Sequence, residues 1–233
     1  MSQLPRFFVA GPIEEIVRIE GPVAHQISRV LRLRSGDRIV VLDGRGAAWE
    51  AALSEVRNGA VVVRCERPAA CATEPSRAVT LFAAVLKGDR QEWMVQKAVE
   101  LGVARIQPIL TAHGVARPGA DKAERWRRIA QEAAEQCERA IVPPIADPIP
   151  VSATRWPGLA LICTERGGMP LKAAITSTDE ALAVFIGPEG GWEAAELALL
   201  LEKGAIAASL GPRILRAETA ALAALAMILG QES

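Results

Sequence analysis

The chain has 233 residues, of which half are apolar, and its 27 basic and 27 acidic residues leave a formal net charge of zero. That balance argues against a protein that binds nucleic acid by bulk electrostatic attraction, so any RNA contact would need a local basic patch. Four cysteines without CxxC spacing and only two histidines argue against a metal site. No apolar run has the length of a membrane helix and no signal peptide is evident, so we expect a cytoplasmic protein.

The first 70 residues are predicted to be rich in β-strands. Two apolar-alternating runs between Arg38 and Leu53 flank Asp43 and Gly44, which is the pattern of a β-hairpin. Val61 to Glu66 adds a further strand, and the segment before the hairpin predicts a short helix and a turn. We therefore predict a small domain over residues 1–70, followed by a proline-containing linker over residues 71–77.

From residue 78 to residue 233, strands alternate with helices. Strands are predicted at Val79 to Leu86, Arg105 to Leu110, Leu159 to Cys163, Ala181 to Ile186 and Ala205 to Leu210. This alternation predicts an α/β domain with a mostly parallel sheet and helices on both faces.

Two helices of this domain show the spacing of a capping box. Asp89 and Glu92 are predicted to open a helix that stops at Gly102. Asp121 and Glu124 are predicted to open a longer helix that reaches Arg139 and carries one apolar stripe. The last helix, after residue 216, is apolar on every face, and we expect Leu222, Leu225, Met227, Ile228 and Leu229 to need cover on more than one side.

A glycine-rich turn, IGPEGGW over residues 186–192, joins a predicted strand to a predicted helix. Such a turn presents backbone N–H groups to a ligand at the carboxyl end of a strand. It matches neither GxGxxG nor the P-loop pattern, and Glu189 stands where a phosphate site would need a lysine. The turn therefore favours a neutral or cationic ligand, unless its glycines serve only the sterics of a tight turn.

Two further strand ends are expected beside this turn. LGPRILRAETA, over residues 210–220, also follows a strand and opens a helix, and it carries Arg213 and Arg216. Thr164, Glu165 and Arg166 follow the strand that ends at Cys163. Because the carboxyl ends of parallel strands share one edge of a sheet, these loops predict a single site.

IGPEGGW and LGPRILRAETA together resemble the cofactor-binding signature of the SPOUT class of RNA methyltransferases. The segments RFFV, HQISRVLRLRSGDRIVVLDGRG, LKGDRQEWMVQKAVELGVARIQPI and ERWRRIAQEAAEQCERAIVPPI extend the resemblance nearly end to end, to the ribosomal RNA small subunit methyltransferase E family. This resemblance implies S-adenosylmethionine as methyl donor and N3 of one uridine in 16S rRNA as acceptor. It also implies an N-terminal PUA-like β-barrel, a C-terminal trefoil-knotted α/β domain and a homodimer that needs no metal.

The resemblance also implies a set of cofactor-binding residues: Thr164, Glu165, Gly187, Pro188, Glu189, Gly190, Gly191, Leu210, Gly211, Ile214, Leu215, Arg216 and Thr219. Uracil N3 carries a proton at neutral pH, so the reaction needs either a base or stabilisation of the developing anion. Glu189 or Glu165 is a candidate base, although Glu189 is equally suited to accept hydrogen bonds from the turn itself. Arg213 and Arg216 would stabilise the anion or bind a phosphate.

The best local basic patch lies between His25 and Arg38 and contains Arg29, Arg32, Arg34 and Arg38, which we predict to contact RNA. The segment from Arg117 to Arg128 is a second candidate. Two other functions remain open from the sequence. One is a non-catalytic RNA-binding protein whose glycine turns are only structural, and the other is a methyltransferase of the same fold that acts on another base or another RNA.

Overall fold

A computed structural model of the chain describes residues 4–57, 59–71, 73–114, 118–175 and 180–230. The chain divides into two compact units. The smaller comprises residues 1–74 and 134–142, and the larger comprises residues 75–133 and 143–233. Two residues of the predictions above, Ala72 of the linker and Arg117 of the second basic segment, lie outside the described residues.

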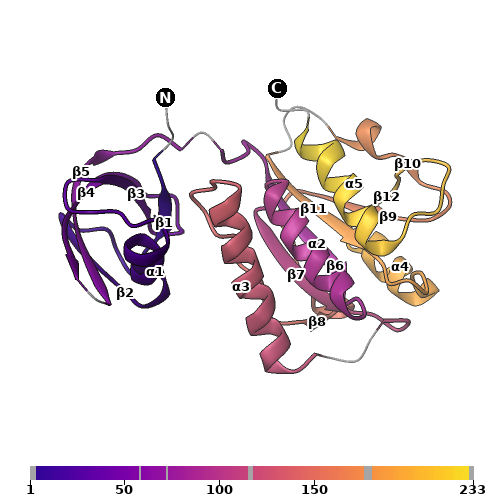
Figure 1. The fold of residues 1–233 in the computed structure, drawn as a ribbon. Helices are drawn as coiled ribbons and strands as arrows, with labels where there is room; N and C mark the ends of the chain where they lie inside the picture. Colours follow the sequence, from indigo (N-terminus) through magenta and orange to yellow (C-terminus); the bar gives the residue numbers. More distant parts are fainter. Residues whose placement is uncertain (1–3, 58, 72, 115–117, 176–179, 231–233) are drawn as a thin grey trace. The chain divides into compact units, whose positions relative to one another are not determined.

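The smaller unit contains a curled five-stranded sheet (Figure 1). Its strands are β1 (Arg6–Phe8), β2 (Ile16–Glu20), β3 (Arg38–Leu42), β4 (Ala48–Arg57) and β5 (Ala60–Pro68), in the order β1-β3-β4-β5-β2. Strands β1 and β3 run parallel, and the other pairs are antiparallel. Within the described residues the edge strands β1 and β2 do not pair with each other, so the sheet is a curled half-barrel.

The predicted hairpin is confirmed. Asp43 Oδ1 accepts hydrogen bonds from the N–H groups of Arg45 and Ala47, at 2.7 and 3.0 Å, and so closes the turn between β3 and β4. The short helix α1 (Gly21–His25) and the π-helical turn η1 (Gln26–Val30) precede β3, as expected. Alternate residues of the strands, such as Ile39 and Val63, pack into one core together with Ile27 of η1.

The larger unit contains a seven-stranded sheet in which every pair is parallel. Its order is β10-β12-β9-β11-β6-β7-β8. The strands are β6 (Ala78–Ala84), β7 (Arg105–Leu110), β8 (Ile149–Pro150), β9 (Leu159–Cys163), β10 (Met169–Pro170), β11 (Ala181–Ile186) and β12 (Ile206–Ser209). The parallel sheet expected from alternating strands and helices is therefore confirmed, whereas the trefoil knot remains a prediction.

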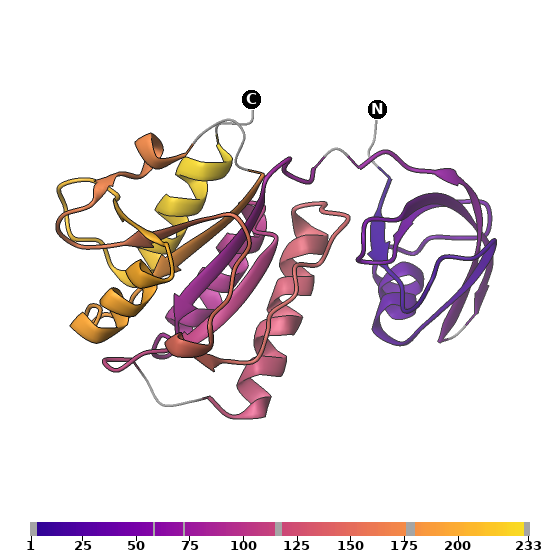
Figure 2. The same ribbon diagram turned by 180° about the vertical axis from the view of Figure 1, so that it is seen from behind.

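Helices cover both faces of this sheet. Figure 1 shows α2 (Asp89–Glu100), α3 (Ala120–Gln136) and α5 (Ala217–Leu229) in front of it, and Figure 2 shows the opposite face. On that opposite face, Leu200 of α4 (Ala194–Glu202) and the short 3-10 helix η2 (Val151–Ala153) pack on Phe82 and Phe185. The remaining 3-10 helix, η3 (Leu171–Ala174), follows β10.

The two predicted capping boxes are wrong. Gly88, not Asp89, occupies the N-cap of α2, with φ 62° and no side-chain cap hydrogen bond. Helix α3 begins at Ala120, so Asp121 lies inside its first turn. Because glycine tolerates a positive φ, it takes the cap position, and the carboxylates then lie in the first turn near the positive end of the helix dipole.

The predicted end of the long helix at Arg139 is also wrong, because α3 ends at Gln136. Glu138 has a positive φ of 62°, and Arg139 turns inward to pair with Glu74 at 2.7 Å. Glu74 also accepts hydrogen bonds from the N–H groups of Ala140 and Ile141. This half-buried carboxylate therefore directs the chain away from the helical path.

The last helix, α5, hides more of its apolar surface within one chain than we expected. Leu225, Ile228 and Leu229 are buried, whereas Leu222 and Met227 are only partly covered and Ala226 is exposed. Three of the five large residues therefore find their cover within one chain, whereas Leu222 and Met227 keep part of their surface open. None of the helices in the described part of the chain combines the length and apolar character needed to cross a bilayer.

Candidate functional site

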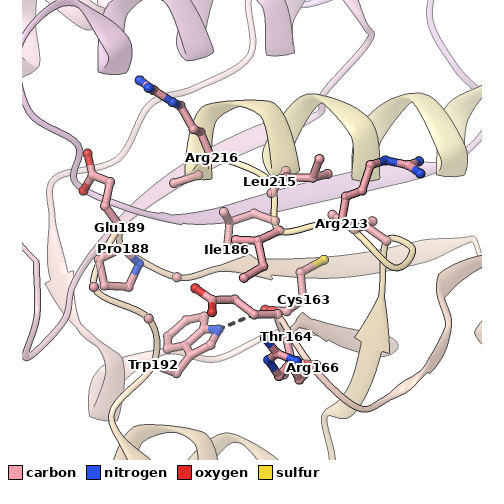
Figure 3. A pocket seen from close by; sticks show the side chains of 18 of the residues that line it. Cys163, Thr164, Arg166, Ile186, Pro188, Glu189, Trp192, Arg213, Leu215 and Arg216 are labelled. Carbon is pink, nitrogen blue, oxygen red and sulfur yellow. Dashed lines mark hydrogen bonds between the residues drawn. The ribbon is translucent and has the colours of Figure 1, made fainter.

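A cleft of the larger unit opens at the carboxyl ends of β9, β11 and β12 (Figure 3). Its volume is about 770 Å³, which is within the usual range for small-molecule sites. Three loops form its walls: the segment after Cys163, the glycine turn from Gly187 to Trp192, and the segment from Leu210 to Arg216. The three strand ends that the sequence predicted to be neighbours are therefore neighbours.

The glycine turn is closed by its own backbone and by an indole ring. The N–H of Gly191 donates to the carbonyl of Pro188 at 3.0 Å, and Gly191 has φ 77°, a conformation that favours glycine. Trp192 Nε1 donates to the carbonyl of Cys163 at 3.1 Å, as drawn in Figure 3. This bond ties the end of β9 to the turn after β11.

Two glycines of the turn are packed against protein. A Cβ at Gly187 would lie 3.0 to 3.3 Å from the Trp192 indole, and one at Gly190 would lie 2.8 Å from His113 Cβ. His113 Nδ1 is also 3.2 Å from the carbonyl oxygen of Gly191. The expectation that the turn is bare only to admit a ligand is therefore incomplete, because Gly190 also makes room for the loop after β7.

The loop from Leu210 to Arg216 forms the opposite wall. Gly211 has φ 119°, and its N–H donates to Ser209 Oγ at 3.2 Å. Arg213 and Arg216 are exposed, and Figure 3 shows their guanidinium groups leaving the loop in different directions. Among the residues that the structure describes, no carboxylate pairs with either of them, so both are available to an anionic group.

The two candidate bases differ in their surroundings. Glu189 pairs with Arg90 of α2 at 2.9 Å, whereas Glu165 is exposed at the end of β9. This ion pair holds the Glu189 side chain against α2. The ion pair therefore favours a structural or electrostatic role for Glu189 over that of a base.

Cys163 lies at the inner wall of the cleft. Burial raises the pKa of its thiol to about 12, because desolvation disfavours the thiolate. The thiol is therefore neutral at physiological pH and is an apolar wall, not a nucleophile.

Twelve of the thirteen residues predicted to bind cofactor, Arg216 among them, line this cleft, and so does Arg213. The exception is Thr219, which lines a neighbouring cavity. Their functional roles remain predictions. The cleft also includes lining residues that were not on that predicted list: Arg90, Cys163, Arg166, Ile186, Trp192, Leu197, Ala217 and Ala220. Of these, Trp192 could have been predicted from the sequence as a lining residue, because it directly follows the glycine pair. No sequence signal connects Arg90 with the turn.

The charged groups of the cleft are of both signs. No lysine is found among its described lining residues, which include four arginines (Arg90, Arg166, Arg213 and Arg216) and two glutamates (Glu165 and Glu189). This set suits a zwitterionic ligand better than the purely neutral or cationic ligand expected from the turn alone. Within the described residues, no group of three or more potential metal-ligating side chains is placed to hold an ion.

The four arginines predicted to contact RNA are all exposed in the smaller unit. Arg32 has a positive φ of 54°, which is unusual for a residue with a side chain. Arg38 pairs with Glu50 at 2.9 Å and with Glu66 at 2.7 Å, so a phosphate would compete with two carboxylates there. Arg29 and Arg34 lie on either side of Arg32 along the same segment.

Family models match both parts of the chain. A model described as an RNA methyltransferase domain matches residues 73–229, and one described as an RNA methyltransferase PUA domain matches residues 19–64. Ribosomal RNA small subunit methyltransferase E of Synechocystis sp. is 39% identical over 224 residues, which are 93% of this chain and 73% of that protein. The protein of the same name from Bacillus subtilis is 32% identical over 90% of this chain and 88% of its own length.

A solved structure is also similar over nearly the whole chain. It is ribosomal RNA small subunit methyltransferase E from Neisseria gonorrhoeae bound to S-adenosyl methionine, which is 31% identical, covers 98% of each chain and has a TM-score of 0.90.

Proposed function

Because this chain belongs to the ribosomal RNA small subunit methyltransferase E family, we propose that it transfers a methyl group from S-adenosylmethionine to N3 of one uridine in 16S rRNA of the small ribosomal subunit. One observation carries the proposal: three loops at adjacent strand ends surround a cleft of about 770 Å³. A similar structure, at 31% identity, binds this cofactor.

The residues of the cleft fit the cofactor. The adenosine part suits the backbone of the glycine turn and the apolar side chains of Ile186, Leu210 and Leu215. Its carboxylate suits an arginine, and its amino and sulfonium groups suit Glu165 or Glu189. The residues that would hold it are Thr164, Glu165, Gly187 to Gly191, Leu210, Gly211 and Ile214 to Arg216, with Thr219 at the margin.

When bound, the cofactor supplies an activated methyl group, so the chain itself has to position the acceptor and manage one proton. Arg213 and Arg216 reach beyond the loop as cations without a carboxylate partner among the described residues. We assign them to the negative charge that develops on the uracil oxygens or to an adjacent phosphate.

RNA is bound, in this proposal, by the N-terminal domain (residues 1–70) through Arg29, Arg32, Arg34 and Arg38. These contacts would position the RNA, whereas the choice of nucleotide is made in the methyltransferase domain. Residues 71–77 link this domain to the methyltransferase domain at residues 78–233.

We also propose that the protein is a homodimer that pairs through α5. Leu222 and Met227 remain partly covered, and Ala223 and Ala226 lie on the same side of the helix. Small and apolar residues on a helix surface allow close approach of a second copy. The N-cap of α5 is Arg216, so pairing there would connect dimer formation with the cleft.

The proposed function is tested by nucleoside analysis. Purified protein is incubated with labelled S-adenosylmethionine and either 16S rRNA or small subunits that lack the modification, and the digested nucleosides are identified by mass spectrometry. We expect label in 3-methyluridine. Label in another nucleoside would show that the acceptor is a different base from the one proposed. Binding of RNA without any methylation would support a non-catalytic protein.

A further inference from the structure

A second cavity lies beside the cofactor cleft and shares Arg90 with it. Its volume is about 320 Å³, and it is lined by Asp89, Arg90 and Trp93 of α2 and by Glu218 and Thr219 of α5. Arg90 also lines the cofactor cleft, where it pairs with Glu189 at 2.9 Å. The Arg90–Glu189 ion pair therefore lies at the boundary between the two spaces.

The burial of Glu218 in this cavity is not explained by packing alone. It is only 8% exposed, and its Oε2 is buried without a hydrogen-bond donor among the described residues. It caps nothing, because the N-cap of α5 is Arg216 and no side-chain cap hydrogen bond is present. A buried carboxylate oxygen without a donor is costly and uncommon, so a donor from outside the chain is the physical reason to keep it.

Trp93 gives the same cavity an aromatic wall. It follows Arg90 by three residues on α2, so both side chains lie on one helix face. Its side chain is 45% exposed despite its size. An exposed indole beside a cavity provides a stacking surface for a nucleobase.

We propose that this second cavity receives the target base, that Trp93 stacks on the base, and that Glu218 accepts the proton from its N3. This inference rests on the proposed function, because only a methyl transfer places a second substrate beside the cofactor. It makes Glu218 a catalytic residue and leaves Glu189 as the partner of Arg90.

The hydrogen-bonding groups of uracil match the groups that line the cavity. Uracil N3 carries a proton and is flanked by two carbonyl oxygens, so a carboxylate accepts from N3 while the guanidinium of Arg90 donates to a carbonyl. Cytosine has no proton at N3 and would direct a lone pair at the carboxylate. Glu218 would therefore select uracil over cytosine as well as remove its proton.

The proton and the electrons are accounted for in the step. The N3–H bond breaks and its proton passes to Glu218 Oε2, while the electron pair on N3 forms the bond to the methyl carbon. The bond from that carbon to sulfur breaks, and its electron pair stays on sulfur, which loses its positive charge. Oε2 itself makes no hydrogen bond within the described residues that the transfer would have to break. The proton then passes to water.

The decisive variant is Glu218→Gln, which keeps the size of the side chain and removes the base. We expect kcat to fall by about a hundredfold or more, with the affinity for S-adenosylmethionine and the KM for RNA unchanged. The difference in kcat between Glu218→Gln and the wild type should become smaller at high pH, because uracil N3 then loses its proton to the solvent without the help of a protein base. The other charged groups near Glu218 are Asp89 and Arg90 of α2 and Arg216 before α5, and none of them changes in this variant.

Glu92→Gln is the matched control, because it removes another first-turn carboxylate, one that pairs with Arg125 at 2.7 Å and does not line the cavity. We expect the wild-type rate. If Glu218→Gln has the wild-type rate, Glu218 is not the base. The same conclusion follows if Asp89→Asn lowers the rate and Glu218→Gln does not. A loss of cofactor affinity as large as the loss of rate would make Glu218 structural and would also overturn it.

Trp93 provides a test that does not depend on how Glu218→Gln folds. Trp93→Leu should raise the KM for RNA by about tenfold, and Trp93→Phe should keep it near the wild-type value. Equal KM values for the wild type, Trp93→Leu and Trp93→Phe would show that the target nucleobase does not bind in this cavity. If the wild type itself makes no 3-methyluridine, the proposed function has failed, whereas an active wild type with unaffected variants refutes only the present inference.

Discussion

The indole N–H of Trp192, in the glycine turn, donates to the carbonyl of Cys163 at the end of β9, which is 29 residues earlier in the chain. The same ring lies against Gly187, where a Cβ would approach it to 3.0 Å. Cleft shape at this position thus depends on one aromatic side chain that fixes the distance between the end of β9 and the glycine turn. Trp192 therefore positions the backbone groups of the glycine turn that we propose to bind the cofactor.

We predict that Trp192→Phe weakens binding of S-adenosylmethionine about fivefold, because it removes a hydrogen bond worth about 1 kcal/mol and keeps the aromatic ring. Isothermal titration calorimetry measures the change. Trp49→Phe, at a partly buried residue that packs against the core of the smaller unit, is the control and should bind like the wild type. Equal affinity of all three proteins would show that the Trp192–Cys163 hydrogen bond does not shape the cofactor site.

At the scale of the elements, two helices of the larger unit end in the same way but in different surroundings. Gly102 follows α2 with φ 94°, and Gly204 follows α4 with φ 92°. A Cβ at Gly102 would lie 2.5 Å from Pro75 Cγ, whereas a Cβ at Gly204 would meet nothing within 4 Å. Both positions require glycine for the backbone, and only Gly102 also requires it for packing.

We predict that Gly204→Ala lowers the melting temperature by about 2–4 °C, since a side chain at positive φ costs about 1 kcal/mol. Gly102→Ala should lower it by at least twice as much, because the clash with Pro75 adds to the strain. Differential scanning calorimetry compares the two variants at one scan rate. Equal shifts would mean that Pro75 moves aside at little cost.

At the scale of the whole molecule, two compact units divide the proposed tasks. The smaller unit presents Arg29, Arg32 and Arg34 on its surface, and the larger unit contains the cleft. A net charge of zero makes such local patches necessary for RNA binding, because the whole chain does not attract a polyanion.

We predict that the double variant Arg32→Glu and Arg34→Glu weakens RNA binding and lowers the slope of log affinity against log salt by about 1–2, as two phosphate contacts are lost. Filter binding at several salt concentrations gives both quantities. The control reverses Arg18 and Arg57 in the same unit, which already pair with Glu20 and Glu55. If the control loses as much affinity, the effect is one of overall charge and the patch is misassigned.

We predict that Ala226→Arg converts the proposed dimer to a monomer and lowers the methyl-transfer rate, because it places a charge on the exposed face of α5. Analytical ultracentrifugation and the methylation assay measure the two effects. Ala198→Arg, on an exposed position of α4, should change neither. Leu225 is unsuitable for this test, since it is buried within one chain. An active wild-type monomer at assay concentrations would refute the dimer.

The sequence by itself determined the elements and the neighbourhood of the cleft. The predicted bounds of Arg105–Leu110, Leu159–Cys163 and Ala181–Ile186 match β7, β9 and β11, because a buried parallel strand is a local apolar run between breakers. The loops around Gly190 and Arg213 were predicted to meet, because parallel strands place their carboxyl ends at one edge. Both conclusions depend only on local pattern and on a general rule of sheet topology.

Only the tertiary structure decided which side chains face one another across elements. The pairing of Glu189 with Arg90, the packing of His113 on Gly190 and the burial of Glu218 join residues from strands and helices far apart in sequence. The N-cap position of Gly88 before α2 and the inward turn of Arg139 also depended on a backbone angle or on a distant partner that residue type alone does not specify. These features follow from packing, in which each side chain responds to its spatial neighbours, and a periodic pattern contains no information about those neighbours.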